Sequence, residues 1–497
     1  MVNDLAYKGK RLSVIGAGVS GRSLAELAKK LGADVFVSDL NEIPQETAAA
    51  FGSTGIRWES GGNTEKLLEA DEIVVSSGIP SDIPILLEAS SKGIPVTSEL
   101  DFVYPFLSGK IIAITGSNGK TTTASMAGYF LERSGAVSMT GGNIGDPAAN
   151  AAFMDTAYLV LELSSFQLSR LERFMCDIAV VTNLAPDHID WHGSYGKYVE
   201  AKANVIRRLK DDGTAICQRR DCEALGVPEG RDCPLTWDRP DPSGRGIYLD
   251  RESSAAYLCP DSGIEPIKLF DFEAVRLLGS HNIENAAMAT AALVLLGLSP
   301  AAPDVISAYE PPKHRCAFAG IFRGITFVDD SKGTNVAATV TAMSSLDGDK
   351  VMILGGRGKG EDYAPLAEAV LKYAKSAVLL GEVGEAAMLA FLFSISEGLE
   401  EYSLARTRRG LRALLSLVPD QATVLRDDTE LVVSSSELHV GDRMLVKPGE
   451  RIATDGIIRN GRTALDVSAI TGESVPVEAE PGHEVFAGSI NGTGVLE

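Results

Sequence analysis

The chain is poor in positive charge, in aromatic residues and in long apolar runs. Of its 497 residues 46 are Lys or Arg and 67 are Asp or Glu, so the net charge is −21, and aromatic residues make up 6%. Binding to nucleic acid or to an anionic membrane depends on cationic surface, so we expect neither partner. The apolar stretch at residues 386–395 is far shorter than the roughly 20 residues of a membrane-spanning helix, so we expect no stable membrane insertion.

Metal-binding cysteine pairs and a secretion signal are also missing. The N-terminus, MVNDLAYKGKRLSVIG, enters strand-like sequence at once, without an apolar segment behind a basic head. We therefore expect a cytoplasmic protein whose reduced thiols mostly pack in its interior. The six cysteines are scattered and contain no C-x-x-C pair: Cys176, Cys217, Cys222, Cys233, Cys259 and Cys316.

What the sequence does contain is a series of short apolar strands that alternate with helical patterns, which predicts parallel α/β sheets. At about 150 residues per domain, the length predicts three or four domains. One series starts at RLSVIG, a second at KIIAIT and a third at ITFVDDS. Between Pro228 and Pro266 the chain is rich in Pro, Gly, Asp and Arg, which predicts surface excursions or short antiparallel strands within the second series.

A first glycine-rich loop follows the strand RLSVIG. Its sequence is GAGVSG, residues 16–21, and Asp39 ends the next strand about 20 residues further on. This is the dinucleotide-binding fingerprint, in which glycines let backbone amides approach a diphosphate at a helix N-terminus. A tight structural turn or an NAD-dependent oxidoreductase would also explain this loop taken alone.

A second loop, GSNGKTTT at residues 116–123, follows the strand KIIAIT and precedes a helical pattern. In such a loop the amides surround phosphate oxygens, Lys120 compensates phosphate charge and the hydroxyl of Thr121 can bind Mg²⁺. A strict P-loop would have glycine where Ile114 stands. The form T-G-x-N-G-K-T is instead characteristic of Mur ligases and of the related folylpolyglutamate synthases.

Further motifs follow in the order that Mur ligases have them. They are GNIG (142–145), LELSSFQL (161–168), NLAPDHID (183–190), Lys202, HNIEN (281–285), His314-Arg315 and DSKGTN (330–335). Over about residues 1–390 the chain therefore resembles the Mur ligase family. Its GAGVSG, SSGIP and SEL segments are similar to those of the member that adds D-glutamate, whereas folylpolyglutamate ligases ordinarily lack this N-terminal unit.

The resemblance implies ATP-dependent addition of D-glutamate to UDP-N-acetylmuramoyl-L-alanine through an acyl phosphate. Both steps bring anions together, so the site needs cations, and the family implies ATP and two Mg²⁺ ions. The implied catalytic residues are Lys120, Glu162, His188, Lys202 and Lys332. The implied metal-site residues are Thr121, Glu162, His188 and Lys202, the last as a carbamate.

The resemblance also implies three sets of binding residues. For ATP they are Gly116, Ser117, Asn118, Gly119, Lys120, Thr121, Thr122, Asn282, Asn285, Arg315 and Asp330. For the UDP-linked substrate they are Gly18, Ser20, Asp39, Gly78, Asn143 and His188. For D-glutamate they are Lys332, Thr334 and Lys359.

Each of these assignments has a structural alternative. Lys202 lies in the helical pattern YVEAKANVIRRLK, whose other basic residues are surface charges, and without the resemblance we would assign it to the same surface. Asn282 could cap a helix. Asp187 and Asp190 could form a solvated acidic turn, and His192 could be a structural residue.

From about residue 391 the chain departs from the Mur ligases. It resembles the end of a membrane helix and the actuator domain of heavy-metal P-type ATPases, with the T-G-E-S loop at Thr471, Gly472, Glu473 and Ser474. In those pumps the glutamate acts on an aspartyl phosphate. The sequence has no D-K-T-G-T phosphorylation loop and no C-P-C metal site, so we expect no pump chemistry.

We therefore predict an α/β fold of three Rossmann-like or P-loop Mur ligase domains, the third truncated, followed by a small β-rich domain. The predicted divisions are 1–109 for the UDP-substrate domain, 110–313 for the ATP domain, 314–390 for the acceptor domain, 391–418 for a helical segment and 419–497 for the actuator-like domain. We expect impaired ligation and a monomer unless residues 386–395 associate. The alternatives are an actuator fragment that binds a pump, or a fusion that only binds nucleotide.

Overall fold

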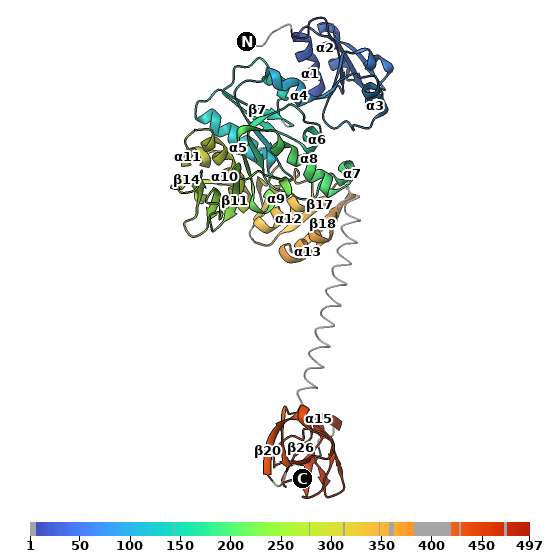
Figure 1. The fold of residues 1–497 in the computed structure, drawn as a ribbon, viewed down its shortest axis with the longest axis vertical. Coiled ribbons are helices and arrows are strands. Elements are labelled where there is room, and N and C mark those ends of the chain that lie inside the picture. The colour runs from blue at the N-terminus through green and yellow to red at the C-terminus, as the bar shows by residue number, and fades with distance from the viewer. Residues whose placement is uncertain are drawn as a thin grey trace. The chain divides into compact units, whose positions relative to one another are not determined.

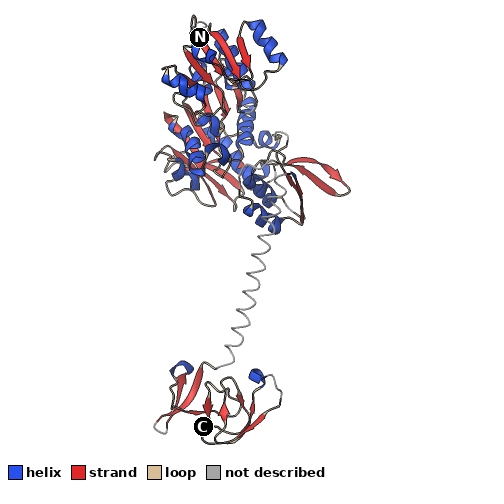
Figure 2. Ribbon diagram, turned by 90° about the vertical axis from the view of Figure 1, so that its right-hand side faces the viewer, coloured by secondary structure: helices blue, strands red, loops and turns tan. Residues whose placement is uncertain are grey.

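The computed structural model divides the chain into two compact units, Met1–Phe391 and Leu392–Glu497 (Figure 1). Helices and strands alternate in the first unit, whereas strands dominate the second (Figure 2). The structure describes residues 6–143, 145–277, 279–311, 314–346, 348–356, 362–381, 419–426, 429–471 and 475–497.

The N-terminal part of the first unit is a parallel five-stranded sheet with the order β3-β2-β1-β4-β5. The strand order reverses between β1 and β4, and in open α/β sheets ligands bind at such a switch point. The GAGVSG loop leaves β1 at this place. The strands are β1 (Arg11–Ile15), β2 (Asp34–Asp39), β3 (Arg57–Ser60), β4 (Glu72–Val75) and β5 (Val96–Ser98), and the helices are α1 (Val19–Lys30), α2 (Gln45–Thr54) and α3 (Pro84–Ser91).

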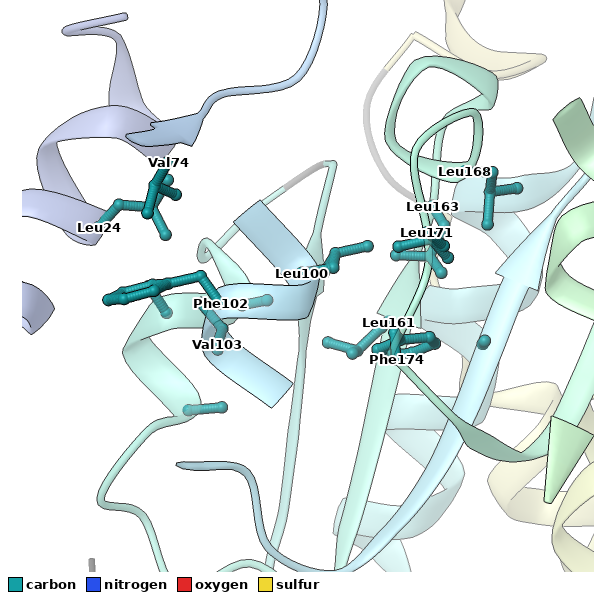
Figure 3. Packing of buried hydrophobic residues seen from close by; sticks show 14 of the residues in the cluster. Leu24, Val74, Leu100, Phe102, Val103, Leu161, Leu163, Leu168, Leu171 and Phe174 are labelled. Atoms are coloured by element: carbon teal, nitrogen blue, oxygen red, sulfur yellow. The ribbon is translucent and has the colours of Figure 1, made fainter. Parts of the chain in front are cut away.

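A short helix, α4 (Glu99–Val103), joins this sheet to the next one. All five of its residues are buried, because apolar side chains surround it on two sides. Figure 3 shows Leu100, Phe102 and Val103 between two groups that belong to one continuous cluster: Leu24 and Val74 of the first sheet, and Leu161, Leu163, Leu168, Leu171 and Phe174 of the central region. The two sheets are therefore held by a shared hydrophobic core.

The central sheet has nine strands in the order β14-β13-β12-β11-β10-β9-β6-β8-β7. Its strands are β6 (Lys110–Thr115), β7 (Ser138–Gly142), β8 (Tyr158–Glu162), β9 (Cys176–Val181), β10 (Leu209–Gln218), β11 (Asp232–Trp237), β12 (Gly246–Asp250), β13 (Ala255–Cys259) and β14 (Ile267–Asp271). The associated helices are α5 (Lys120–Arg133), α6 (Ser165–Leu168), α7 (Ile189–His192), α8 (Tyr195–Arg207), α9 (Cys222–Leu225), α10 (Ser280–Leu295) and α11 (Pro303–Ser307).

The segment between Pro228 and Pro266 differs from the expectation. It holds β11 and β12, which continue the parallel sheet from β10, and only β13 is antiparallel to its neighbours on both sides. The reason is burial: Leu235, Ile247 and Leu249 are at most 2% exposed and join the core cluster that contains α10. Most prolines and glycines here lie in the turns between strands, but Pro234 lies within β11 and Gly246 begins β12.

Residues 314–381 form the third part of the first unit. An antiparallel hairpin joins β15 (Ala317–Phe322) to β16 (Ile325–Asp329), and a parallel pair joins β17 (Val351–Gly355) to β18 (Ser376–Leu380). Helices α12 (Val336–Ser345) and α13 (Ala364–Tyr373) pack against the β17–β18 pair. Within the described residues this pair has no third strand, and its outward apolar side chains are 47–69% exposed: Val351, Ile353, Val378 and Leu380.

The second unit consists of small antiparallel sheets around one apolar cluster that includes Val446, Ile452, Ile458 and Leu465. Its elements are β19 (Gln421–Arg426), β20 (Thr429–Ser434), β21 (Arg443–Leu445), β22 (Gly456–Ile457), β23 (Thr463–Asp466), α15 (Ser468–Thr471), β24 (Val477–Ala479), β25 (Glu484–Val485) and β26 (Ile490–Asn491). This agrees with the predicted small β-rich fold.

Among the residues that the structure describes, no helix has both the length and the apolar character needed to cross a membrane. The predictions for the helical segment 391–418 and for the apolar stretch 386–395 concern residues outside the described ranges.

Candidate active site

The second glycine-rich loop connects β6 to the N-terminus of α5, as its sequence predicts. Gly116 and Gly119 have φ values of +140° and +83°, which side-chain-bearing residues rarely adopt. A Cβ atom on Gly116 would lie 2.0 Å from Oγ1 of Thr182, and one on Gly119 would lie 2.5 Å from Oδ1 of Asn285. The loop therefore requires glycine at both positions, and it leads into the N-terminus of α5, where helix amides favour an anion.

Two reciprocal contacts hold this loop in shape. The Asn118 amide donates to Oδ1 of Asn183 at 2.9 Å, and the Asn183 side chain donates back to the Asn118 carbonyl at 3.0 Å. The Ser117 hydroxyl donates to the Ala185 carbonyl and accepts from the Ala185 amide, both at 2.8 Å. The loop is thus fixed by the NLAPDH segment before any ligand arrives, which reduces the ordering cost of binding.

Two lysines converge on one carbonyl oxygen behind the loop. Nζ of Lys120 donates to the Gly116 carbonyl at 2.8 Å, and Nζ of Lys202 donates to the same oxygen at 2.7 Å. Lys202 is 1% exposed and lies 4.8 Å from the ring centroid of Tyr198. Burial, together with the nearby Lys120 charge, holds the pKa of Lys202 well below its usual range. The surface-charge interpretation of Lys202 is wrong.

Acidic groups face these lysines. Glu162 and Asp187 are 2% and 5% exposed, and their charges oppose the lowering of the Lys202 pKa. Asn143 donates to Oε1 of Glu162 at 3.4 Å. The imidazole of His188 lies 3.7 Å from Oδ1 of Asp187. Lys120, Glu162 and Lys202 are thus brought together, with His188 beside Asp187, whereas the solvated acidic turn is wrong for Asp187 and holds only for the exposed Asp190.

A cavity of about 310 Å³ is lined in part by Asn118 and Gly119 of the loop. Arg315 reaches across to the loop, where its Nη2 donates to Oγ1 of Thr121 at 2.7 Å. Asp330 accepts from the Cys316 amide, and burial raises the pKa of this carboxyl. Eight of the predicted site residues line the cavity: Asn118, Gly119, Thr122, Asn282, Asn285, Arg315, Asp330 and Lys332.

Two further residues at the site, Glu284 and Asn335, had no role assigned from the sequence, and of these Glu284 lines the cavity. Glu284 accepts from Nε2 of Gln218 at 3.0 Å and from Nε1 of Trp237 at 2.8 Å. Asn335 donates to Oδ1 of Asn118 at 3.0 Å and to Oδ2 of Asp187 at 3.2 Å. Both lie inside the quoted motifs HNIEN and DSKGTN, but only the folded chain shows their partners.

The residues predicted for the UDP-linked substrate come from two sheets. Gly18 precedes α1, and Gly78 has a φ of +87°; a Cβ atom on either would meet nothing within 4 Å. Asp39 accepts from the Ala17 amide at 2.7 Å and therefore also fixes the glycine loop. Ser20 hydrogen-bonds the buried Glu99. Asn143 and His188 belong to the central sheet region.

The residues predicted for D-glutamate are only partly described. Lys332 and Thr334 are exposed at the start of the third part, and Lys332 also lines the cavity. Lys359 lies outside the described residues. In the second unit Thr471 ends α15, while Gly472, Glu473 and Ser474 lie outside the described residues.

The donor set suits a hard cation that is shared with a substrate. The Thr121 hydroxyl and the Glu162 carboxylate offer oxygen, which Mg²⁺ prefers. In the described part of the chain, no three His, Cys, Asp or Glu side chains gather as metal ligands.

In the comparison with known proteins, two parts of the chain match different protein families. Residues 11–84 match the MurD N-terminal domain, 114–293 match the Mur ligase middle domain and 416–497 match the P-type ATPase actuator domain. A UDP-N-acetylmuramoylalanine–D-glutamate ligase from Acidobacterium capsulatum is 36% identical over 391 residues, covering 77% of this chain and 84% of that protein. Among solved structures, UDP-N-acetylmuramate–alanine ligase from Thermotoga maritima is 18% identical, covers 78% of this chain and 89% of that one, and has a TM-score of 0.49.

A second relative matches the C-terminal part of the chain. A probable cation-transporting ATPase G from Mycobacterium tuberculosis is 82% identical over 124 residues, which is 25% of this chain. This chain spans only 16% of that pump.

The glycine loop, its lysines and the matching domains define an ATP-dependent amide ligase, and the chain belongs to the Mur ligase family. Within that family it is similar to the UDP-N-acetylmuramoylalanine–D-glutamate ligases, and it carries a P-type ATPase actuator segment at its C-terminal end.

Proposed function

We propose that this chain binds ATP and UDP-N-acetylmuramoyl-L-alanine and converts the substrate carboxylate to an acyl phosphate for attack by D-glutamate. The observation that carries the proposal is the meeting of Lys120 and Lys202 on the Gly116 carbonyl, with the charges of Glu162 and Asp187 facing them. Cations placed between two anionic reactants lower the barrier to their approach. The proposal includes a cytoplasmic location, because the reaction consumes ATP.

In this proposal the loop amides and Lys120 hold the ATP phosphates, and Arg315 and Asp330 complete the nucleotide cavity. Gly18, Ser20, Gly78, Asn143 and His188 bind the UDP-linked substrate. Lys332, Thr334 and Lys359 receive the two carboxylates of D-glutamate. Thr121, Glu162, His188 and Lys202 would hold Mg²⁺, which offsets the repulsion between phosphate and carboxylate oxygens.

We also propose that Lys202 acts as a carbamate. Carbon dioxide reacts with a neutral amine: a bond forms between Nζ and the carbon, one proton leaves, and the side chain becomes an anion. The depressed pKa of Lys202 makes the neutral amine available, and the carbamate would be attracted to the Lys120 ammonium instead of repelling it.

We further propose that ligation is weak or lost because the acceptor part is incomplete. The described β17–β18 pair leaves four apolar side chains exposed where a further layer of the domain would be expected to pack. The chain also covers 84%, not all, of the ligase from Acidobacterium capsulatum. Nucleotide binding rests on the central part and is expected to survive.

The test combines binding and turnover on the same purified chain. We expect calorimetric binding of ADP with Mg²⁺ and of UDP-N-acetylmuramoyl-L-alanine, with phosphate release and product formation at least about 100-fold below those of a complete ligase. Turnover equal to that of the complete enzyme would refute the impairment. If neither ADP nor UDP-N-acetylmuramoyl-L-alanine binds, the proposed function itself is refuted. Binding of nucleotide alone would support the alternative, a fusion that only binds nucleotide.

A further inference from the structure

Two cysteines outside the proposed chemistry lie unusually close together. Cys217 is next to the end of β10, Cys222 is the first residue of α9, and their Sγ atoms are 2.7 Å apart. Both residues are buried, at 0% and 6% exposure. A disulfide bond has a length of about 2.05 Å, so a closing movement of about 0.65 Å separates the two states.

The pair is asymmetric, as a reactive dithiol requires. The hydrogen bond between the two sulfur atoms, helped by the Arg219 charge, lowers the pKa of Cys222, while the pKa of Cys217 is raised. The thiolate is the attacking form in thiol–disulfide exchange, so Cys222 is the first nucleophile. The small exposed fraction of the pair also belongs to Cys222.

One of the residues between the two cysteines, Arg220, lines the nucleotide cavity. Asp221 accepts from the Leu184 amide at 3.2 Å, and Leu184 also lines the cavity. Arg219 pairs with Asp241 at 2.8 Å. A covalent link from Cys217 to Cys222 would therefore close a short loop around a segment that contributes Arg220 to the cavity to which the proposed function assigns the nucleotide.

We propose that Cys217 and Cys222 form a dithiol that a low-molecular-weight disulfide, such as oxidised glutathione, converts to an intramolecular disulfide close to Arg220 of the nucleotide cavity. The Cys222 thiolate attacks one sulfur of the reagent and releases one glutathione thiolate. The Cys217 thiolate then attacks Sγ of Cys222 and releases the second. The protein loses two hydrogens as two protons and two electrons, and the reagent is reduced to two thiols.

In the experiment, the full chain is incubated in an inorganic buffer that contains oxidised and reduced glutathione. Samples are quenched with acid and an alkylating reagent, and intact mass and peptide maps are recorded. We expect the loss of two hydrogens, a cross-link between the peptides that hold Cys217 and Cys222, and reversal by excess reduced thiol. Hydrogen exchange of residues 218–225 is expected to slow severalfold in the oxidised form.

Two variants separate the roles. In Cys217→Ser the reaction is expected to stop after its first step, with a glutathione adduct on Cys222. Cys233→Ser is the matched control, because Cys233 is buried on β11 and burial raises its pKa to about 12. This control is expected to form the cross-link as the parent chain does. Two glutathione adducts without a cross-link in the parent chain, or no reaction at all, would overturn the proposal. This result comes from the peptide map of the parent chain and therefore does not depend on whether the variants fold.

Discussion

At the scale of single residues, Lys202 is the side chain whose state determines the proposed chemistry. Lys202→Ala removes the group that would become an anion beside Lys120. We expect substrate-dependent ADP formation to fall by about 100-fold, the range seen when a group that supports a metal site is lost. ADP formation in the presence of UDP-N-acetylmuramoyl-L-alanine measures this directly.

The matched control is Lys197→Ala, because Lys197 lies on the same helix and is exposed. It is expected to keep the activity of the parent chain. The carbamate itself is tested by carbon-13 spectroscopy of the parent chain equilibrated with labelled carbon dioxide, where a carbamate signal is expected that Lys202→Ala lacks. A signal of equal size in Lys202→Ala would contradict the assignment.

His192 gives a prediction about pH. Its Nε2 lies 2.9 Å from Oγ of Ser165, and its ring is stacked on Phe166. Burial is the main cause that lowers its pKa to about 4 from 6.5. Between these pH values the unfolded chain binds a proton that the folded chain does not, so the free energy of unfolding decreases as the pH falls.

His192→Gln removes this titration and keeps a polar group for Ser165. We expect thermal stability of the parent chain to be maintained above pH 6.5 and to fall towards pH 4, by up to about 3 kcal/mol at about 1.4 kcal/mol per pKa unit. The variant is expected to show a shallower fall in the melting temperature over the same window. Parallel curves for the two chains would count against the prediction.

At the scale of elements, Asn335 connects three parts of the site. Its Oδ1 accepts from the Ala338 amide and caps α12, and its side-chain amide contacts Asn118 and Asp187. Asn335→Asp keeps the cap but turns a donor into an acceptor that faces two oxygens. We expect about a tenfold loss of ADP affinity by calorimetry, with little change in the stability of α12.

Asn335→Ser is the companion variant, because serine also caps a helix but is too short to make both contacts. Asn335→Ser is expected to weaken ADP binding less than Asn335→Asp does, because serine adds no negative charge that repels the two neighbouring oxygens. If both variants bind ADP as the parent chain does, the link between α12 and the phosphate loop has no role in nucleotide binding.

Local sequence signals predicted the elements that depend on neighbours along the chain. The strand before each glycine loop and the helix after it appear in the structure. Contacts between distant segments could not be predicted in this way. Asp187 lies in a segment with the composition of a solvated turn, and its buried carboxylate accepts a hydrogen bond from Asn335, 148 residues further along the chain.

The same limit applies to the central sheet and to the cysteines. The Pro-rich segment from 228 to 266 contains turn residues, and its apolar positions show strand character only when they pack against α10. Cys217 and Cys222 have no recognised spacing, and the sequence indicated only buried thiols. Their approach depends on the turn between β10 and α9.

At the scale of the whole molecule, the chain joins two units with separate hydrophobic cores. The ligase from Acidobacterium capsulatum is 36% identical to this chain over 391 residues, and the ATPase G from Mycobacterium tuberculosis is 82% identical over 124 residues. We expect residues 419–497 to fold when produced alone, because the apolar cluster around Ile452 and Leu465 lies entirely within them. A core of this size supports a free energy of unfolding of about 3–5 kcal/mol at most.

We expect residues 1–381 to bind ADP within about twofold of the full chain, because every described residue that lines the nucleotide cavity lies in this part. Urea unfolding of the short fragment and calorimetry of the long one measure the two expectations. A short fragment without a cooperative transition, or a long one that loses ADP binding while it stays folded by circular dichroism, would show that the two units depend on each other.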